Sequence, residues 1–292
     1  MKRISKDELQ NIVKSVPLLS ASASQLLQLT SKPDHDMSDI VNLVKTDANL
    51  TARVLKVVNS AAFGLINHIT SIDRAISYLG ERIIISIALG DCAGKLFEKE
   101  LAGYEAAAGD LWKHDLRTAI AAREVVVQSE SDISPDLAFT AGLLHDIGKA
   151  LISDYLKDTA PEALAMVSSQ DNADYLDAEE KMVGFDHTEA GFELAKIWHL
   201  PDELAEVIHY HHKPADATEK YQALVYAVHL GDNIAMMGGF GTGADSMQYR
   251  LDPNYTDFFK LGPKTLANIM LTVDIEFEKL GHSLDSSGDT KE

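Results

Sequence analysis

Apolar residues recur every three or four positions along most of the chain, the spacing that places them on one face of an α-helix. One clear example follows Asp47, an aspartate of the kind that often caps the start of a helix. The apolar positions of this segment are Leu50, Val54, Val57 and Val58. Nearer the N-terminus, Ser5 and Glu8 have the spacing of a capping box, which predicts a helix that begins directly after Ser5.

Two further segments extend this pattern to residue 97. Residues 72–79 show helical spacing between Ser71 and Gly80, which are ordinary start and stop residues of a helix. Residues 82–97 are almost continuously apolar, which predicts a buried helix. Residues 83–85 alone would fit a β-strand, but no alternating partner follows them. The pattern therefore predicts an all-α fold.

A second helical half begins near residue 100. Ser134 followed by Pro135 is a strong start signal, because serine caps the helix and proline fits its first position. The apolar run that follows continues to Ile152 and contains His145 and Asp146, so we expect one helix with this pair inside it. Three more helices are expected in this half, over residues 203–212, 221–237 and 263–280.

This pattern divides the chain into two helical halves and a polar tail. We expect an N-terminal half over residues 1–100, a second half over 101–280 and a disordered tail over 281–292. The glycine-rich stretch 238–243 fits either a plain loop or a nest of backbone amides that cradles a phosphate. No strand precedes it and no Gly-Lys-Ser/Thr follows, which favours the loop.

The charge balance narrows the classes of partner. The chain has 45 acidic and 26 basic residues, a formal net charge of −19, and no basic cluster, which argues against nucleic acids and anionic membranes. A small anionic substrate would still bind if a metal cation supplied positive charge. Cys92 is the sole cysteine, there is no apolar leader, and no apolar run reaches the ~20 residues of a membrane helix. We therefore expect a cytoplasmic protein.

Several histidines and aspartates occupy positions where the predicted helices should be apolar. They are His114, His145, Asp146, His187, His211, His212 and Asp232. A single buried histidine is ordinarily bonded to a backbone carbonyl, and a single acid ordinarily caps a neighbouring helix. An unpaired buried carboxylate is costly, however, and residues of this kind on several helices are satisfied most cheaply by converging on one cation. Their number favours a metal site.

Lys149 lies three residues after Asp146 and four after His145, so it shares their helical face. It is expected either to stabilise charge on a substrate or to be an ordinary exposed lysine. In the first case a Lys149→Ala variant keeps its metal and its helical content. His199, His209 and His229 flank the candidate site, and we expect supporting or surface positions for them.

The polar positions resemble the motif of the HD superfamily of metal-dependent phosphohydrolases, which consists of His, then His-Asp, then a distant Asp. The matching residues are His114, His145, Asp146 and Asp232. Residues 46–64 (TDANLTARVLKVVNSAAFG) and 69–84 (ITSIDRAISYLGERII) resemble the HDOD (HD-related output domain) family of bacterial signalling proteins. Many HDOD proteins have lost the ligands and act as protein-interaction modules, whereas this chain retains them.

A further resemblance concerns the additional histidines. His187, His211 and His212 are similar to those of the HD-GYP cyclic-dinucleotide phosphodiesterases, and Asp110 stands where these enzymes can carry another acidic ligand. The sequence KPADAT at 213–218 replaces the GYP signature, so the resemblance does not extend to hydrolysis of cyclic-di-GMP.

These resemblances imply a metal-dependent phosphohydrolase with two divalent transition metal ions. The first ion would be held by His114, His145, Asp146 and Asp232, and the second by Asp146, His187 and His211 or His212. Nitrogen and oxygen ligands suit iron, manganese, nickel or zinc. Asp146 and Lys149 would act in hydrolysis of a phosphorylated small molecule or nucleotide, Lys149 by stabilising charge at phosphorus. The alternative is a non-catalytic output module that binds signalling proteins and keeps a structural or vestigial metal.

Overall fold

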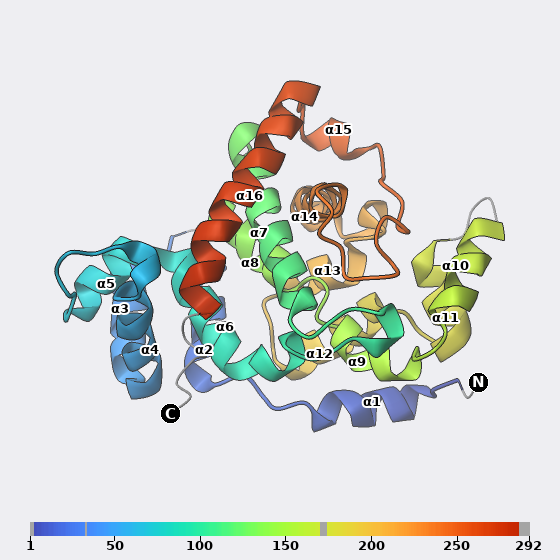
Figure 1. The fold of residues 1–292 in the computed structure, drawn as a ribbon, viewed down its shortest axis with the longest axis horizontal. Helices are drawn as coiled ribbons and strands as arrows, with labels where there is room; N and C mark the ends of the chain where they lie inside the picture. The colour runs from blue at the N-terminus through green and yellow to red at the C-terminus, as the bar shows by residue number, and fades with distance from the viewer. Residues whose placement is uncertain (1–2, 33, 170–173, 286–292) are drawn as a thin grey trace.

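The computed structural model describes residues 3–32, 34–169 and 174–285, and within these ranges it contains α-helices and short 3-10 helices but no β-strand (Figure 1). An isolated antiparallel bridge joins Leu101 and Ala106. The all-α fold predicted from the sequence is confirmed. Among the same residues, no helix combines the length and apolarity needed to cross a membrane.

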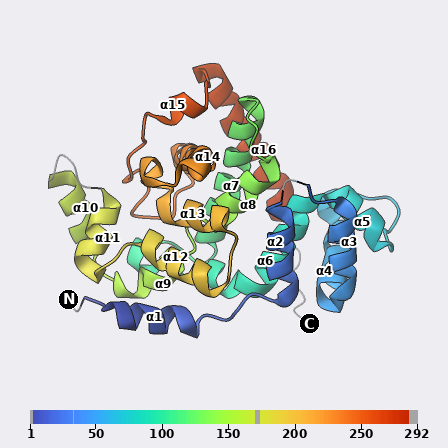
Figure 2. The same cartoon turned by 180° about the vertical axis from the view of Figure 1, so that it is seen from behind.

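The N-terminal half consists of α-helices and a 3-10 helix. These elements are α1 (Lys6–Ser15), α2 (Ala21–Thr30), α3 (Met37–Thr46), α4 (Ala48–Val58), η1 (Ala61–Phe63), α5 (Ile72–Leu79) and α6 (Glu81–Phe97). Helices α2–α5 form a small group at one end of the molecule (Figure 1). As predicted, Ser5 and Glu8 form a capping box, and the Asp47 side chain accepts from the backbone N–H groups of Asn49 and Leu50. Helix α1 lies apart from α2–α5 and runs along α12 in both views (Figures 1 and 2).

The larger C-terminal half surrounds α7. Its elements are η2 (Ala102–Tyr104), α7 (Asp110–Gln128), α8 (Pro135–Leu144), α9 (Lys149–Ile152), η3 (Ser153–Tyr155), α10 (Ala160–Ser169), α11 (Tyr175–Val183), α12 (His187–Ile197), α13 (Asp202–Tyr210), η4 (Pro214–Asp216), α14 (Glu219–Met237), α15 (Tyr255–Phe258) and α16 (Pro263–Asp285). Helices α8, α14 and α16 all pack on α7, and α16 also reaches η1 and α4 of the N-terminal half (Figure 1).

Two glycines allow α8 and α14 to approach α7 closely. A Cβ atom on Gly142 or on Gly231 would lie 2.7 Å from backbone atoms of α7, so a larger residue would force the helices apart. Gly142 lies one turn before His145, and Gly231 directly precedes Asp232. Close packing at these two points therefore brings His145 and Asp232 toward His114, which α7 carries.

The predicted continuous helix through His145 and Asp146 is wrong. Helix α8 ends at Leu144, residues 145–148 form a turn, and α9 begins at Lys149. Gly148 packs so closely against α12 that a Cβ there would lie 1.9 Å from the carbonyl oxygen of His187. The tertiary contact fixes the path of the chain at this point, and it places the side chains of the turn inside the bundle.

Other predicted boundaries shift by a few residues. Helix α13 ends at Tyr210, so the pair at 211–212 follows the helix instead of ending it. Helix α14 begins at Glu219, and α16 continues to Asp285. Residues 281–285 of the predicted disordered tail are thus helical, whereas 286–292 lie outside the described residues.

Candidate metal centre

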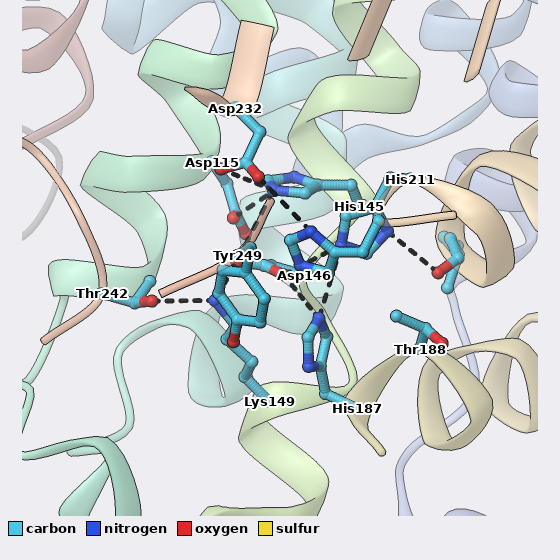
Figure 3. A network of polar contacts seen from close by, with 12 residues as sticks. Asp115, His145, Asp146, Lys149, His187, Thr188, His211, Asp232, Thr242 and Tyr249 are labelled. Carbon is cyan, nitrogen blue, oxygen red and sulfur yellow. Dashed lines mark hydrogen bonds and ion pairs between the residues drawn. The ribbon is translucent and has the colours of Figure 1, made fainter. Parts of the chain in front are cut away.

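The seven predicted ligand residues converge in one buried cluster between the helices of the C-terminal half (Figure 3). They are His114 on α7, His145 and Asp146 in the turn after α8, His187 at the start of α12, His211 and His212 after α13, and Asp232 on α14. His212 has the largest exposed fraction, 8%. Segments that are far apart in the sequence therefore form a single polar site within an apolar core.

The first part of the cluster joins His114 and His145 to two carboxylates. His114 Nε2 lies 3.1 Å from Asp232 Oδ1 and 3.5 Å from Asp146 Oδ2, and His145 Nε2 also lies 3.5 Å from Asp146 Oδ2. The other ring nitrogens donate to backbone carbonyls: His114 Nδ1 to Phe240 at 2.7 Å and His145 Nδ1 to Gly142 at 2.7 Å. These hydrogen bonds leave each Nε2 free to bind a cation.

The second part of the cluster lies on the other side of Asp146. Its Oδ1 atom is 3.2 Å from His187 Nε2 and 3.4 Å from His211 Nε2. His211 Nδ1 donates to the carbonyl of Ile208 at 3.1 Å, and His187 Nδ1 donates to Glu179 Oε2 at 2.8 Å. Each oxygen of Asp146 thus faces a different group of histidines, the arrangement of a carboxylate that can bridge two ions.

Unpaired buried atoms show that the site fits a metal. Among the described residues, the buried atoms without a hydrogen-bond partner include Nε2 of His114 and His145, both oxygens of Asp115, both ring nitrogens of His212, and Oδ2 of Asp232. Native proteins rarely leave buried polar atoms unsatisfied. One donor atom from each of Asp146, His187, His211 and His212 lies within 4.8 Å of the others, as do donors of His114, Asp115, His145 and Asp146. A cation within each of these two groups of residues would satisfy the unpaired donor atoms that face it.

The electrostatics of the cluster favour the ligand forms of most of these residues. Burial lowers the pKa of His145 to about 3 and holds the pKa of His212 well below its usual value, so both rings are neutral. Burial raises the pKa of Asp146, but Lys149 and His145 outweigh it and hold that pKa well below the usual range. Neutral imidazole and ionised carboxylate are the forms that bind metal.

The pKa of His114 is lowered by burial but raised overall by Asp232 and Asp146, in contrast to His145 and His212. His187 shows the same pattern more strongly. Burial lowers its pKa, but the charge of Glu179 and the hydrogen bond to Asp146 outweigh that effect and raise the pKa to about 10. In the absence of metal this ring is therefore protonated at neutral pH, and a cation that binds it displaces a proton.

Lys149 is buried at the centre of the cluster, so the alternative of an exposed helix lysine is wrong. Its Nζ atom lies 2.7 Å from Asp146 Oδ2 and 2.6 Å from Asp245 Oδ2, and it donates to Thr242 Oγ1 at 2.9 Å. Burial lowers the pKa of this ammonium, but Asp146 and Asp245 raise it above its ordinary value overall. Lys149 is thus a fixed positive charge inside the site.

Residues 238–250, which we call the covering segment, close the cluster on this side. Phe240 contributes the carbonyl bonded to His114, and Asp245 pairs with Lys149. The Tyr249 ring stacks on His212 with centroids 3.8 Å apart, and its hydroxyl donates to Asp245 at 2.9 Å.

The glycine-rich part of the covering segment, residues 238–243, is a loop in which four of the six backbone amides are already engaged. The N–H groups of Gly238, Gly239 and Phe240 donate to carbonyls of α14, and that of Gly243 donates to Ser246 Oγ. The plain-loop interpretation is the one the structure supports, because these amides are not free to cradle a phosphate.

Asp110, the further acidic ligand that the resemblance suggested, lies outside the cluster, whereas His229 occupies the expected supporting position. Asp110 lies at the start of α7, accepts from the backbone N–H of Ala107 and pairs with Lys113 at 3.0 Å, outside the cluster. His229 is buried behind the site, where its Nδ1 atom donates to the carbonyl of His211 at 2.6 Å. His209 is half-buried against Phe192, and His199 is exposed.

Four further residues of the site were not predicted. Asp115 and Glu179 are fully buried at the cluster, and Asp245 and Tyr249 belong to the covering segment. The signal for Asp115 was present, since it directly follows His114 and has Leu111, Trp112 and Ala119 three or four residues away on the same helix. Asp245 and Tyr249 lie in a segment without periodicity, where no sequence pattern identifies a buried position.

An all-helical bundle around a buried group of histidines and aspartates defines a protein of the HD type. More narrowly, the chain belongs to the HDOD family, whose domain matches residues 16–214. It is 25% identical over 216 residues to an uncharacterized protein of Treponema pallidum, a match that covers 74% of this chain and 41% of that protein. The chain thus spans about two fifths of the length of this relative.

Solved structures share the fold. An HDOD domain protein of unknown function from Geobacter sulfurreducens is 21% identical with a TM-score of 0.67, covering 96% of this chain and 98% of its own. A proposed signal transduction protein from Marinobacter aquaeolei is 20% identical with a TM-score of 0.72, covering 97% and 62%. A proposed phosphohydrolase from Shewanella amazonensis is 24% identical with a TM-score of 0.62, covering 94% and 97%.

Proposed function

We propose that this HDOD protein binds divalent transition metal ions at the buried cluster and hydrolyses a phosphoester there, the substrate being a nucleotide or another phosphorylated small molecule. The observation that carries the proposal is the shared position of Asp146. Its two oxygens face two separate groups of histidines at 3.2–3.5 Å, and Oδ2 is also paired with Lys149. A bridging carboxylate between two cations accounts for this geometry.

The charge of the cluster supports two ions. Its buried acids are Asp115, Asp146, Glu179, Asp232 and Asp245. Lys149 is the one buried lysine among them, so five ionised carboxylates leave an excess of four negative charges once a cation has displaced the proton of His187. Uncompensated charges in a protein interior are costly. Two divalent cations would balance this excess.

The chemistry of phosphoester hydrolysis fits these groups. A divalent metal polarises phosphoryl oxygens and lowers the pKa of water. Lys149 adds a positive charge beside Asp146, where it would stabilise the charge that develops on a phosphoryl group. Because the ligands are buried, the covering segment has to move before a substrate enters, and Lys149 would then exchange Asp245 for the phosphate.

The burial of the cluster beneath the covering segment favours a second candidate function, a partner-binding output module with a structural metal. Structural metal sites are closed, whereas catalytic sites keep a position open for water or substrate. Tyr249 stacks on His212, and Lys149 is already paired with a carboxylate on each side. Under this proposal the metal stabilises the helical surface that a signalling protein recognises.

One experiment separates the two candidates. The full chain is loaded in turn with manganese, iron, nickel and zinc and offered bis(p-nitrophenyl) phosphate, a panel of nucleotides and cyclic dinucleotides. The enzyme proposal expects metal-dependent release of product that an Asp146→Asn variant loses. Metal-loaded protein that hydrolyses none of these substrates would favour the structural metal.

A further inference from the structure

Asp115 is a buried carboxylate that the His, His-Asp, Asp motif does not include. It has no exposed surface, and neither of its oxygens has a hydrogen-bond partner among the described residues. His145 Nδ1 lies 3.7 Å from Asp115 Oδ1, but this nitrogen already donates to the carbonyl of Gly142 at 2.7 Å. The carboxylate therefore has no hydrogen-bond donor of its own in this part of the cluster.

The buried lysine of the site does not supply the missing partner. Lys149 Nζ lies 2.7 Å from Asp146 and 2.6 Å from Asp245, and it donates to Thr242 at 2.9 Å. These three acceptors use the three N–H donors of the ammonium. An ionised Asp115 consequently requires a different cation.

The geometry places Asp115 within reach of an ion at the first metal position. One donor atom each of His114, Asp115, His145 and Asp146 lies within 4.8 Å of the others. Ligand atoms on opposite sides of an ion, each at about 2.1 Å, are themselves about 4.2 Å apart. Donor atoms within 4.8 Å of one another are therefore close enough to share one ion.

We infer that Asp115 is an additional ligand of the first metal position and makes that position selective for manganese over zinc. The inference rests on the metal binding proposed above. With Asp115, the first position has three carboxylates and the two imidazoles of His114 and His145. The second position has three imidazoles and the one carboxylate of Asp146. Carboxylate-rich sites suit manganese, and imidazole-rich sites suit zinc, so the two positions are chemically unequal.

Manganese binding to chelator-stripped full chain tests the inference, with free Mn²⁺ followed by electron paramagnetic resonance. The Asp115→Asn variant should bind Mn²⁺ at least about 10-fold more weakly than the wild type, because a charged ligand is lost. Zinc binding at the histidine-rich position should change far less. The matched control is Glu124→Gln, which alters another buried carboxylate of α7, one that is paired with Arg123 outside the cluster.

The possible outcomes separate this inference from the function on which it rests. If the wild type binds neither metal, the proposed function fails. If the wild type binds Mn²⁺ and Asp115→Asn binds it equally well, only the role of Asp115 is overturned. A crystal structure of the manganese-loaded wild type tests ligation by Asp115 without a variant. An Asp115 oxygen within about 2.5 Å of the anomalous manganese peak supports ligation, and a separation beyond about 3.5 Å contradicts it.

Discussion

Replacing Lys149 with methionine tests how the buried charges of the cluster stabilise the fold. The substitution keeps the length of the side chain but removes the ammonium that lies 2.7 Å from Asp146 and 2.6 Å from Asp245. Both carboxylates are at most 1% exposed and would lose their common cation. Removing one partner of a buried ion pair costs about 3–5 kcal/mol. We expect Lys149→Met to lower the free energy of unfolding by about that amount in the metal-free protein.

The matched control is Lys99→Met. Lys99 also pairs with an aspartate, Asp154, at 2.7 Å, but the Asp154 side chain is 65% exposed. Exposed pairs contribute about 0–1 kcal/mol, so this variant should unfold almost like the wild type. Urea unfolding at neutral pH, followed by circular dichroism, measures both.

The two variants together show whether burial makes the ion pairs of Lys149 contribute more to stability than the exposed pair of Lys99. If the free energies of unfolding of Lys149→Met and Lys99→Met differ by less than about 1 kcal/mol, the buried ion pairs of Lys149 do not stabilise the fold as expected. The expected loss also changes the prediction made from the sequence, where Lys149→Ala was to keep both fold and metal. In the structure Lys149 pairs with the buried Asp146, so a neutral replacement disturbs the cluster itself.

Three other predictions concern the cluster, its packing and an ion pair in the N-terminal half. Asp146→Ala should remove more metal than His187→Ala in elemental analysis, because Asp146 faces both groups of histidines; equal losses would argue against a bridge. Gly148→Ala should lower the unfolding temperature strongly, since its Cβ would lie 1.9 Å from a backbone oxygen, whereas Gly94→Ala on α6 meets nothing within 4 Å and should be neutral or stabilising. Burial lowers the pKa of His35, but hydrogen bonds to a backbone carbonyl and a buried carboxylate raise it overall. The stabilisation from His35 is therefore present below its unfolded pKa of about 6.5 and lost as pH rises through the folded value. His35→Gln should accordingly cost more stability in urea unfolding near pH 6 than near pH 9, and an equal cost at both would contradict this account.

The sequence predicted the helices best where local signals agree. Helix α4 has a capping aspartate and apolar residues at helical spacing, and its predicted face, Leu50, Val54, Val57 and Val58, is buried. The same logic identified the cluster, because histidines and aspartates on apolar faces can only point inward. These predictions depended on short-range periodicity, which a single sequence displays directly.

What the sequence could not predict depends on contacts between distant segments. The turn at 145–148 is set by the packing of Gly148 against His187, and no local pattern encodes that contact. The burial of Lys149 follows from Asp245, which lies almost one hundred residues later in an aperiodic segment. Periodicity reports which face of a helix is buried, but it does not report which loop will cover a site.

The metal content of the purified full chain shows whether the buried cluster is a metal centre. Elemental analysis should find about one to two transition metal ions per chain after purification without chelator, or after reconstitution with manganese, iron, nickel or zinc. The same protein should unfold at a higher temperature than its chelator-stripped form, because an ion that binds only the folded chain stabilises it. Protein that contains no metal, takes up none on reconstitution and unfolds at the same temperature in both forms would contradict the assignment of the buried cluster as a metal centre.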